Sequence, residues 1–412
     1  MGLDALARLK PLLGSLLAAL FVAAAAIVAA LLAPGSPAAA QSANAHCGTE
    51  TGDTSSAGWT SHEQLKRQLA QIERASGGRV GVEVVGHSNR GREIFAATVG
   101  SGDQVALITS EIHGNEKTGT EALLSMLRYL GSSDSARARE IRENITLVAM
   151  PKMNPDAAEL DRRGNDMSWQ EVVERFPQLA GARPAWNYYT GRLQNDDYSQ
   201  RPGFDVNRDF NPDLDYVPRP QDFPGSSSRP GWYITPEAQA VRDVYRDLLD
   251  RFGRVDVFVD LHHQGPCYRV GDEDGDYVTL SLSAQFVPDP RTPEGARYAE
   301  YADRYDFDFS RQLNVAAYDA LQAMGSSPFK NVTLYPQGLD LPGTALGSFA
   351  LNGSGTVLFE VRGQTWTYGQ KQKGQLTRAV ETGLYGILQS VADGSVREID
   401  PERYHEIPQT AR

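Results

Sequence analysis

Two short segments of the chain carry side chains that could together hold a metal ion. His113 and Glu116 stand three positions apart after one apolar segment, and His262 and His263 end another. One histidine of the second pair would complete a set of two His and one Glu, which leaves a fourth position for water, as in catalytic zinc sites. Because successive side chains of a strand point to opposite faces, only one of the two can be the ligand.

Each half of this set has an ordinary explanation when it is taken alone. The spacing H-x-x-E often occurs by chance, and a surface His beside a Glu at a helix N-terminus would account for it. Two histidines at the end of a buried strand are harder to explain without a partner, and metal ions are common partners. Asp205 could orient a bound His by accepting its second N–H, although an ordinary loop Asp would look the same.

Other charged residues could bind a substrate or move a proton. Asn207 and Arg208 combine an amide with a guanidinium, which can bind a carboxylate bidentately, and Arg163 lies in a second polar segment. Taken singly, such arginines are usually solvated. Glu360 lies inside the apolar segment 356–361, where a carboxylate is either paired or functional. Beside a metal-bound water it would be a general base, whereas on the outer face of an edge strand it would have no chemical role.

Alternating strand and helix patterns must position these residues. Apolar segments predict strands at 80–85, 93–99, 104–110, 145–150, 255–261 and 356–361. Caps and helical spacing predict helices at 62–75, 118–130, 236–252, 292–324 and 376–391. This alternation predicts an α/β fold: a single domain with a mixed, mostly parallel central sheet flanked by helices. His113 would then follow the carboxyl end of a strand, where such sheets form their sites.

A long polar loop interrupts the alternation. Residues 164–204 are rich in Asp, Asn, Pro, Gly and aromatic residues, and they predict a loop with one helix near 169–176. A loop of this length inside a compact domain is usually functional. We place the catalytic domain at 59–393 and a polar C-terminal tail at 394–412.

The N-terminal residues predict export. A short basic start precedes a nearly uninterrupted Ala/Leu run at 12–32, and Ala38-Ala39-Ala40 supplies small residues for cleavage. We therefore predict a bacterial-type signal peptide at 1–40, a flexible lead-in at 41–58 and a secreted protein with no membrane contact after signal removal. The alternative is a retained transmembrane anchor, because the run is long enough to span a bilayer.

Charge and cysteine content restrict the partners and suggest a disulfide. The 412 residues carry a formal net charge of -12, which argues against nucleic acid or anionic membranes because phosphate binding needs clustered Lys and Arg. Cys47 and Cys267 are the two cysteines. In an exported protein they predict one disulfide, and the alternative is two unpaired thiols. The sequence predicts no particular oligomeric state.

Taken in order, these motifs resemble those of a known enzyme family. They are His113-x-x-Glu116, Asn154-Pro155-Asp156, Arg163-x-Asn165, Asp205-x-Asn207-Arg208, His262 and Glu360, preceded by Gly86-x-Ser88-x-x-Gly91-Arg92-x-Ile94. Together they resemble the zinc metallocarboxypeptidases of the carboxypeptidase A type, over about residues 60–390. Each motif is weak by itself, but their common order is specific.

The resemblance implies the metal ligands. His113, Glu116 and His262 would bind one zinc ion. In the family the His directly after the strand is the ligand, which favours His262 over His263. Asp205 is similar to the carboxylate that orients His113.

The resemblance also implies the residues that act on a substrate. Arg163 resembles the arginine that polarises the scissile carbonyl, and Asn207 and Arg208 resemble the pair that binds the terminal carboxylate of a peptide. Glu360 resembles the general base. Tyr335 is the best candidate for the mobile tyrosine that closes over the substrate in the family.

Three features depart from the family pattern. Ala157 follows Asn-Pro-Asp where the family usually has Gly, and Arg162 beside Arg163 leaves the choice between the two arginines open. The stretch between 165 and 205 is longer than in the simplest members, so the resemblance does not predict the shape of the cleft rim.

The combined prediction is a secreted zinc-dependent carboxypeptidase acting on peptides with a free C-terminus. The small, apolar segment 343–347 favours a neutral or hydrophobic C-terminal residue, although Asp340 could instead select Lys or Arg. The closest alternative keeps the zinc and changes the substrate, as in a peptidoglycan-peptide amidase or an N-acyl amino acid deacylase. A zinc-free binding module is a third possibility, and the presence of every ligand and of Glu360 argues against it.

Overall fold

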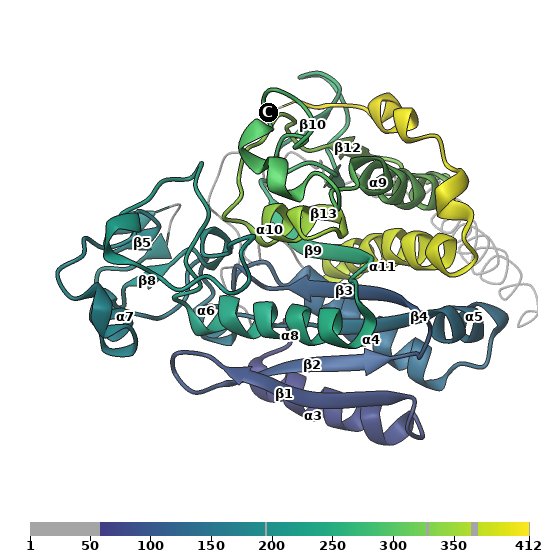
Figure 1. Ribbon diagram of the computed structural model, residues 1–412. Helices are drawn as coiled ribbons and strands as arrows, with labels where there is room; N and C mark the ends of the chain where they lie inside the picture. Colours follow the sequence, from purple (N-terminus) through teal and green to yellow (C-terminus); the bar gives the residue numbers. More distant parts are fainter. Residues whose placement is uncertain (1–57, 194–195, 327–328, 364–369, 412) are drawn as a thin grey trace, which may run out of the picture. The chain divides into compact units, whose positions relative to one another are not determined.

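A mixed eight-stranded sheet forms the centre of the described part of the chain (Figure 1). The computed structural model describes residues 58–411, apart from 194–195, 327–328 and 364–369. The strands follow the order β1, β2, β4, β3, β9, β13, β11, β12 across the sheet. In chain order they are Val80–His87 (β1), Glu93–Val99 (β2), Gln104–Ser110 (β3), Ile145–Met150 (β4), Val257–Gln264 (β9), Leu280–Ser283 (β11), Val332–Leu334 (β12) and Gly355–Arg362 (β13).

The middle of the sheet is parallel. β4 with β3, β3 with β9, and β9 with β13 all pair in parallel, as do β11 and β12. The pairs β1–β2, β2–β4 and β11–β13 are antiparallel. The predicted mixed, mostly parallel sheet is confirmed. Because neighbouring parallel strands end at the same edge, the segments at the ends of β3, β9 and β13 meet there.

Helices cover both faces of the sheet. Side chains of α3, α4, α5, α9 and α11 pack into a core on one face, and those of α8 and α10 pack into a core on the other. The helices are His62–Ala75 (α3), Thr118–Ser132 (α4), Ala136–Asn144 (α5), Pro155–Glu159 (α6), Trp169–Arg175 (α7), Pro236–Phe252 (α8), Phe307–Gln322 (α9), Ala345–Leu351 (α10) and Gln370–Ala392 (α11).

Local capping signals explain why α3 and α8 have the predicted bounds. Ser61 and Gln64 form a capping box at the start of α3. Thr235 caps α8 through its side chain, and Gly253 ends that helix in the left-handed region at φ 74°, a conformation that glycine adopts without strain.

Alternation along β9 decides which histidine faces which side. Val257 and Val259 belong to the core beneath α4 and α9, whereas Phe258 belongs to the core beneath α8 and α10. His262 shares the parity of Phe258 and faces the α10 side. His263 faces the opposite side, where its Nε2 accepts a hydrogen bond from the backbone of Thr118 at 3.1 Å.

Several predicted elements have different bounds in the structure, among them the helix at 292–324 and the strand at 255–261. The helix predicted at 292–324 is divided into a 3-10 helix, Ala296–Tyr301, and α9. Asp306 begins α9 by accepting a hydrogen bond from the backbone of Phe309 at 2.9 Å. β9 continues to Gln264, so both histidines lie within the strand rather than after it.

The C-terminal segment, predicted as a polar tail at 394–412, packs against the domain. It contains the 3-10 helices Ser395–Glu398 and Pro401–Glu406 and the short strand β14, Thr410–Ala411. Tyr404 and Ile407 are buried, and the Tyr404 hydroxyl accepts a hydrogen bond from the backbone of Ala284 at 3.1 Å. These few apolar residues anchor the otherwise polar C-terminal segment to the domain.

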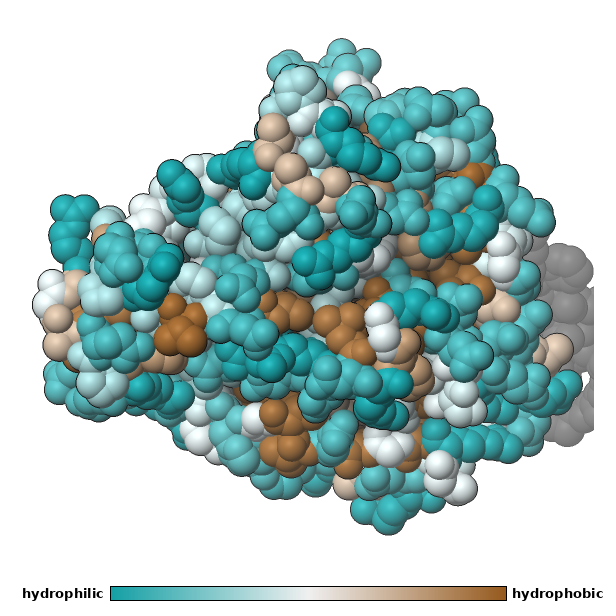
Figure 2. Space-filling view, in the orientation of Figure 1, coloured by the Kyte–Doolittle hydropathy of each residue, from teal (hydrophilic) through white to brown (hydrophobic). Residues whose placement is uncertain are grey.

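The face shown in Figure 2 is mostly hydrophilic, with small hydrophobic patches between the hydrophilic side chains. No helix within the described residues has the length and hydrophobicity that a transmembrane segment requires. The predicted signal peptide at 1–40 and Cys47 lie outside the described residues, so export and a disulfide between Cys47 and Cys267 stay predictions.

Candidate active site

Three buried side chains at the end of the parallel strands bring their ligand atoms together. His113 and Glu116 lie between β3 and α4, and His262 lies in β9. One ligand atom from each residue lies within 4.8 Å of the others. Within the ranges that the structure describes, this is the one group of three or more His, Cys, Asp or Glu side chains that converges in this way.

Neighbouring carboxylates determine which nitrogen of each imidazole carries the proton. His113 Nε2 lies 3.2 Å from Asp205 Oδ1, and His262 Nε2 lies 2.8 Å from Asp260 Oδ2. In the tautomer that suits a metal site, each Nε2 donates its proton to this outer carboxylate. The two Nδ1 atoms therefore present lone pairs, and they lie 3.2 Å apart.

These lone pairs and the Glu116 carboxylate fit a zinc ion. His113 Nδ1 lies 3.0 Å from Glu116 Oε1, and His262 Nδ1 lies 2.9 Å from Glu116 Oε2. Two lone pairs and a carboxylate repel at such distances unless a cation lies between them. Two imidazoles oriented by outer carboxylates, together with one Glu, are the ligand set of a catalytic zinc site.

The charges around this cluster favour a cation. Burial by itself would raise the pKa of Glu116, but His113 and His262 outweigh burial and hold that pKa well below its usual value. Burial would lower the pKa of His262, but Asp260 and Glu116 outweigh it and raise that pKa well above its usual value. The pocket therefore holds either an added proton or a metal ion.

Asp205 connects the cluster to Arg163. Its Oδ2 accepts hydrogen bonds from Arg163 Nε and Nη2 at 3.0 and 2.9 Å. Its Oδ1 accepts from the backbone of Asn207 at 3.0 Å, in addition to His113. Burial alone would raise the pKa of Asp205, but Arg163 and Arg208 outweigh burial and hold it well below its usual value. Asp205 is thus an ionised, fully bonded carboxylate behind His113.

The two adjacent arginines have different surroundings. Arg163 Nη1 lies 3.3 Å from His113 Nδ1, so this guanidinium is at the cluster. Arg162 points away from it and donates to the carbonyls of Gly164 at 3.1 Å and Arg201 at 2.5 Å, with its guanidinium over the Tyr198 ring. Arg162 therefore fastens the inserted loop, and Arg163 is the arginine near the cluster.

The inserted loop 164–204 also holds Arg163 in place. Asp196 accepts a hydrogen bond from the Arg163 backbone at 2.7 Å. The Tyr198 hydroxyl accepts from the backbone of Gly164 at 2.7 Å and donates to Asp196 at 3.2 Å. The contacts of Asp196 with Arg163 and of Tyr198 with Gly164 join positions more than thirty residues apart, and no local pattern in the sequence predicted them.

A cavity of about 390 Å³ brings together nearly all of the predicted residues. The predicted residues that line it are His113, Glu116, Arg163, Asn207, Arg208, His262, Tyr335 and Glu360. Asp205 does not line the cavity and lies behind His113. The candidate ligands, the two arginines and a buried glutamate therefore line one cavity, although they come from distant parts of the chain.

Glu360 is brought into this cavity by strand register. It lies in β13, directly opposite His262 in β9, and its side chain shares a face with Leu358. Glu360 is 9% exposed, and its own carbonyl accepts a hydrogen bond from Gln264 Nε2 at 3.0 Å. Its carboxylate therefore faces the cavity from the strand next to that of His262, a candidate metal ligand.

Asn207 and Arg208 belong to a short 3-10 helix, Val206–Arg208. Asn207 Oδ1 accepts a hydrogen bond from the backbone of Ala345 at 3.0 Å, and Arg208 Nη1 donates to the Asn207 carbonyl at 2.6 Å. Tyr335 follows β12, and its backbone donates to the carbonyl of Leu282 at 2.8 Å. All three side chains border the cavity.

One part of the cavity wall, here named the apolar pocket, consists of Phe286, Leu339, Leu341 and Leu358. The apolar pocket itself contains no acid, and the only carboxylates that line the whole cavity within the described residues are Glu116 and Glu360. Asp340 is not part of the lining, because it contacts Arg297 at 2.5 Å and the Tyr298 hydroxyl at 2.6 Å. This arrangement suits an apolar group better than a cation.

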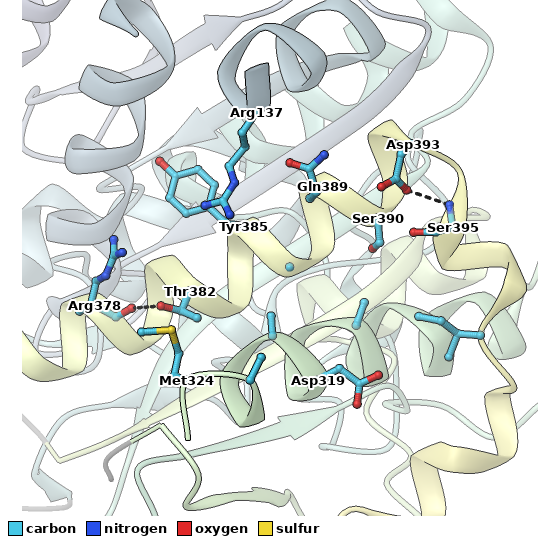
Figure 3. Close-up of a pocket in the computed structure, with 15 residues that line it drawn as sticks. Arg137, Asp319, Met324, Arg378, Thr382, Tyr385, Gln389, Ser390, Asp393 and Ser395 are labelled. Carbon is cyan, nitrogen blue, oxygen red and sulfur yellow. Dashed lines mark hydrogen bonds between the residues drawn. The ribbon is translucent and has the colours of Figure 1, made fainter. Parts of the chain in front are cut away.

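A larger groove of about 530 Å³ lies between α9 and α11, away from these residues (Figure 3). Figure 3 shows polar and charged side chains along it, among them Arg137, Asp319 and Arg378. Arg378 is paired with Glu381 at 2.9 Å, and Asp319 is paired with Arg403 at 2.8 Å. None of the predicted site residues borders this groove.

Sequence reasoning missed Asp260, the carboxylate behind His262. It is fully buried and also accepts a hydrogen bond from the Thr109 hydroxyl at 2.8 Å. The signal that could have identified it is its spacing, because an acid two positions before a strand histidine lies on the same face. Each imidazole of the cluster thus has its own carboxylate.

Comparisons with known proteins agree with this geometry. A family model described as zinc carboxypeptidase matches residues 65–306, more than half of the 412 residues. The matched range contains the three candidate ligands, Arg163 and Arg208, and it ends before Glu360. A comparison with curated proteins gave no match.

Several solved structures share the fold. Thrombin activatable fibrinolysis inhibitor aligns with a TM-score of 0.53 and 14% identity, over 82% of this chain and 79% of that chain. Carboxypeptidase A from Helicoverpa armigera aligns with a TM-score of 0.50 and 16% identity, over 82% of this chain and 74% of that chain. Bovine thrombin-activatable fibrinolysis inhibitor, in complex with tick carboxypeptidase inhibitor, aligns with a TM-score of 0.50 and 13% identity, over 82% of this chain and 98% of that chain. At these identities the likeness concerns the fold alone.

Proposed function

Because the chain belongs to the zinc carboxypeptidase family and is a zinc-type peptide-bond hydrolase, we propose that it releases the C-terminal residue of peptides that have a free terminal carboxylate. The observation that carries the proposal is the shared cavity. It places a three-ligand cluster, two arginines, an amide and a buried glutamate around one space.

His113, Glu116 and His262 hold a single zinc ion in this proposal. When bound, zinc supplies Lewis-acid polarisation of the scissile carbonyl and lowers the pKa of a water molecule. Asp205 and Asp260 keep the two imidazoles in the tautomer that presents Nδ1 to the ion.

Glu360 is the general base. It accepts a proton from the attacking water and returns it to the leaving amine, so that one carboxylate serves both proton transfers. Arg163 donates to the oxygen that becomes negative in the tetrahedral state, and Asp205 holds its guanidinium for this purpose. Preformed donors of this kind need no rearrangement at the moment of reaction.

Arg208 and Asn207 bind the terminal carboxylate of the substrate, and the apolar pocket receives the side chain of the last residue. Tyr335, at the cavity wall, covers the bound peptide. Recognition of the terminal carboxylate by these two side chains limits cleavage to the last peptide bond. We also propose that the protein is secreted after removal of residues 1–40.

The test compares blocked dipeptides that carry a free or an amidated C-terminus, with wild type and Glu360→Gln, after bound zinc has been measured. We expect release of the last residue from the free-carboxylate peptides only. Removing a general base costs about 10²- to 10⁴-fold in rate, so Glu360→Gln should lose at least about 100-fold while it retains zinc.

The outcomes separate the substrate classes. Equal turnover of the amidated peptides would contradict recognition of the terminal carboxylate. No turnover of any dipeptide by the zinc-loaded wild type, with cleavage of muropeptides or N-acyl amino acids in the same panel, would replace the carboxypeptidase proposal with an amidase or deacylase. Full activity of Glu360→Gln would remove Glu360 from the mechanism.

A further inference from the structure

The loop that carries two of the three candidate ligands begins at a residue with two unfavourable features. Glu111 directly follows β3, two positions before His113, and has φ 53°, in the left-handed region that residues other than glycine rarely adopt. Its side chain is also fully buried. A buried charge is unfavourable unless it is paired and hydrogen-bonded.

A buried lysine compensates the charge of Glu111. Lys152 Nζ donates to Glu111 Oε2 at 2.6 Å, and both side chains are 0% exposed. The Thr120 hydroxyl, from α4, contacts Glu111 Oε1. The pair therefore joins the start of the ligand loop to the segment after β4 and to the helix that follows the loop.

The segment 151–158 holds the rest of the ligand loop as well. Asn154 Nδ2 donates to the carbonyl of Ile112 at 2.9 Å. Gly114 lies so close to the backbone of Ala157 that a Cβ atom at Gly114 would be 2.0 Å from the Ala157 carbonyl carbon. Successive residues of the loop thus contact one neighbouring segment. The buried Lys117 Nζ also joins them, since it donates to the carbonyls of Gly114 at 2.8 Å and Ala158 at 2.6 Å, and the Glu111–Lys152 pair is the contact in which two opposite charges meet.

The turn by itself does not require this ion pair. A glycine at position 111 would adopt a positive φ without strain and would bury no charge. A buried ion pair contributes little net stability but can impose one specific arrangement. The pair is therefore better explained by the position it imposes on the loop than by the stability it adds.

We propose that the Glu111–Lys152 ion pair is a positioning pair that sets where His113 and Glu116 present their ligand atoms, and so sets the zinc affinity. Neither residue lines the cavity, so any effect on catalysis would be transmitted through the ligand loop. The proposal rests on the proposed zinc-binding role of His113 and Glu116.

The test uses Glu111→Gln, the double variant Glu111→Gln/Lys152→Met, and Thr146→Val as a matched control. Thr146 is buried in β4, where its hydroxyl donates to the carbonyl of Gly102 at 2.7 Å and does not contact the ligand loop. Three quantities are measured: zinc Kd by chelator competition, Tm of the zinc-free protein, and the visible spectrum of the Co²⁺-substituted protein.

We expect Glu111→Gln to raise the zinc Kd by about tenfold or more, the range seen when groups behind metal ligands are altered, and to lower Tm. The double variant removes the unpaired buried cation, so its Tm should recover. Its zinc Kd should stay raised and its Co²⁺ spectrum should stay altered. Thr146→Val should lower Tm with an unchanged zinc Kd.

Two results would overturn the inference while leaving the proposed function intact. The first is that Glu111→Gln keeps the zinc Kd and the Co²⁺ spectrum of the wild type. The second is that the double variant recovers the zinc Kd and the Co²⁺ spectrum as well as the Tm. If Glu111→Gln does not fold, the double variant decides alone: a raised Kd supports the inference and a wild-type Kd refutes it. An absence of zinc uptake by the wild type would instead overturn the proposed function, and this inference with it.

Discussion

Replacing the buried acid Glu237 should change how the stability of the protein depends on pH. Glu237 lies in the first turn of α8 and is fully buried. Its carboxylate accepts hydrogen bonds from Asn165 Nδ2 at 3.0 Å and from the backbone of Asn89 at 3.4 Å. Asn165 is two residues after Arg163, so this contact connects α8 to the candidate active site. Burial is the main cause that raises the pKa of Glu237 from 4.5 to about 7.

The sign and size of the effect follow from that pKa. The folded protein holds the proton of Glu237 more tightly than the unfolded chain does. The contribution of Glu237 to the free energy of unfolding is therefore complete below about pH 4.5, and it is lost as the pH rises through about 7. The two pKa values differ by about 2.5, and each unit corresponds to about 1.36 kcal/mol. The ionised form therefore lowers the stability by about 3 kcal/mol above pH 8.

The assay is urea unfolding of wild type and Glu237→Gln between pH 4.5 and 8.5, with EDTA present so that zinc binding does not contribute. The glutamine stays neutral, so the difference in unfolding free energy, variant minus wild type, should increase by about 3 kcal/mol across this range. Any constant offset reflects the altered hydrogen bond to Asn165. As a control, the exposed Glu174→Gln should change the unfolding free energy by less than about 0.5 kcal/mol.

If the difference in unfolding free energy between Glu237→Gln and wild type stayed constant with pH, this reasoning would be refuted. Such a result would mean that Glu237 is ionised in the folded protein without a loss of stability. A decrease with rising pH would mean that an unrecognised cation stabilises the carboxylate. Coincident transitions by fluorescence and circular dichroism are needed before the free energies are compared.

Three further predictions concern zinc and substrate. Asp260→Asn should raise the zinc Kd by about 10- to 100-fold in chelator competition, because it removes the carboxylate that orients His262; an unchanged Kd would contradict that role. Arg208→Gln should lower kcat/KM for free-carboxylate peptides by about 100-fold, the loss expected for one partner of a buried charge pair. An equal loss on amidated peptides would point to misfolding instead. Wild type should prefer C-terminal Phe or Leu over Lys by at least about tenfold in kcat/KM. The reason is that the apolar pocket has no acid and that Asp340 is paired with Arg297. Efficient release of Lys would show that Asp340 changes partners.

The sequence by itself determined the local elements and the residue types of the site. β2, β3, β4, α3 and α8 have the predicted bounds, because strand and helix periodicity and caps such as Ser61 act over a few neighbouring residues. The H-x-x-E spacing and the two histidines of an apolar strand also identified the candidate ligands, since such sites form where neighbouring parallel strands end at one edge of the sheet.

Only the tertiary structure decided which of several similar residues are at the site. Arg162 and Arg163 look alike in sequence, and the contact with Asp205 distinguishes them. The hydrogen bond between Asp260 and His262 and the Glu111–Lys152 ion pair are likewise established only in three dimensions, although the sequence already shows the spacing between Asp260 and His262.

The physical reason lies in the range of the interactions. Strand pairing, such as that of β9 with β13, places Glu360 opposite His262 although they are 98 positions apart in the chain. No local propensity encodes such a pairing, because it depends on the order of the strands in the whole sheet. The pairing of buried charges depends on the same order, since each carboxylate must find its donor across the packed core.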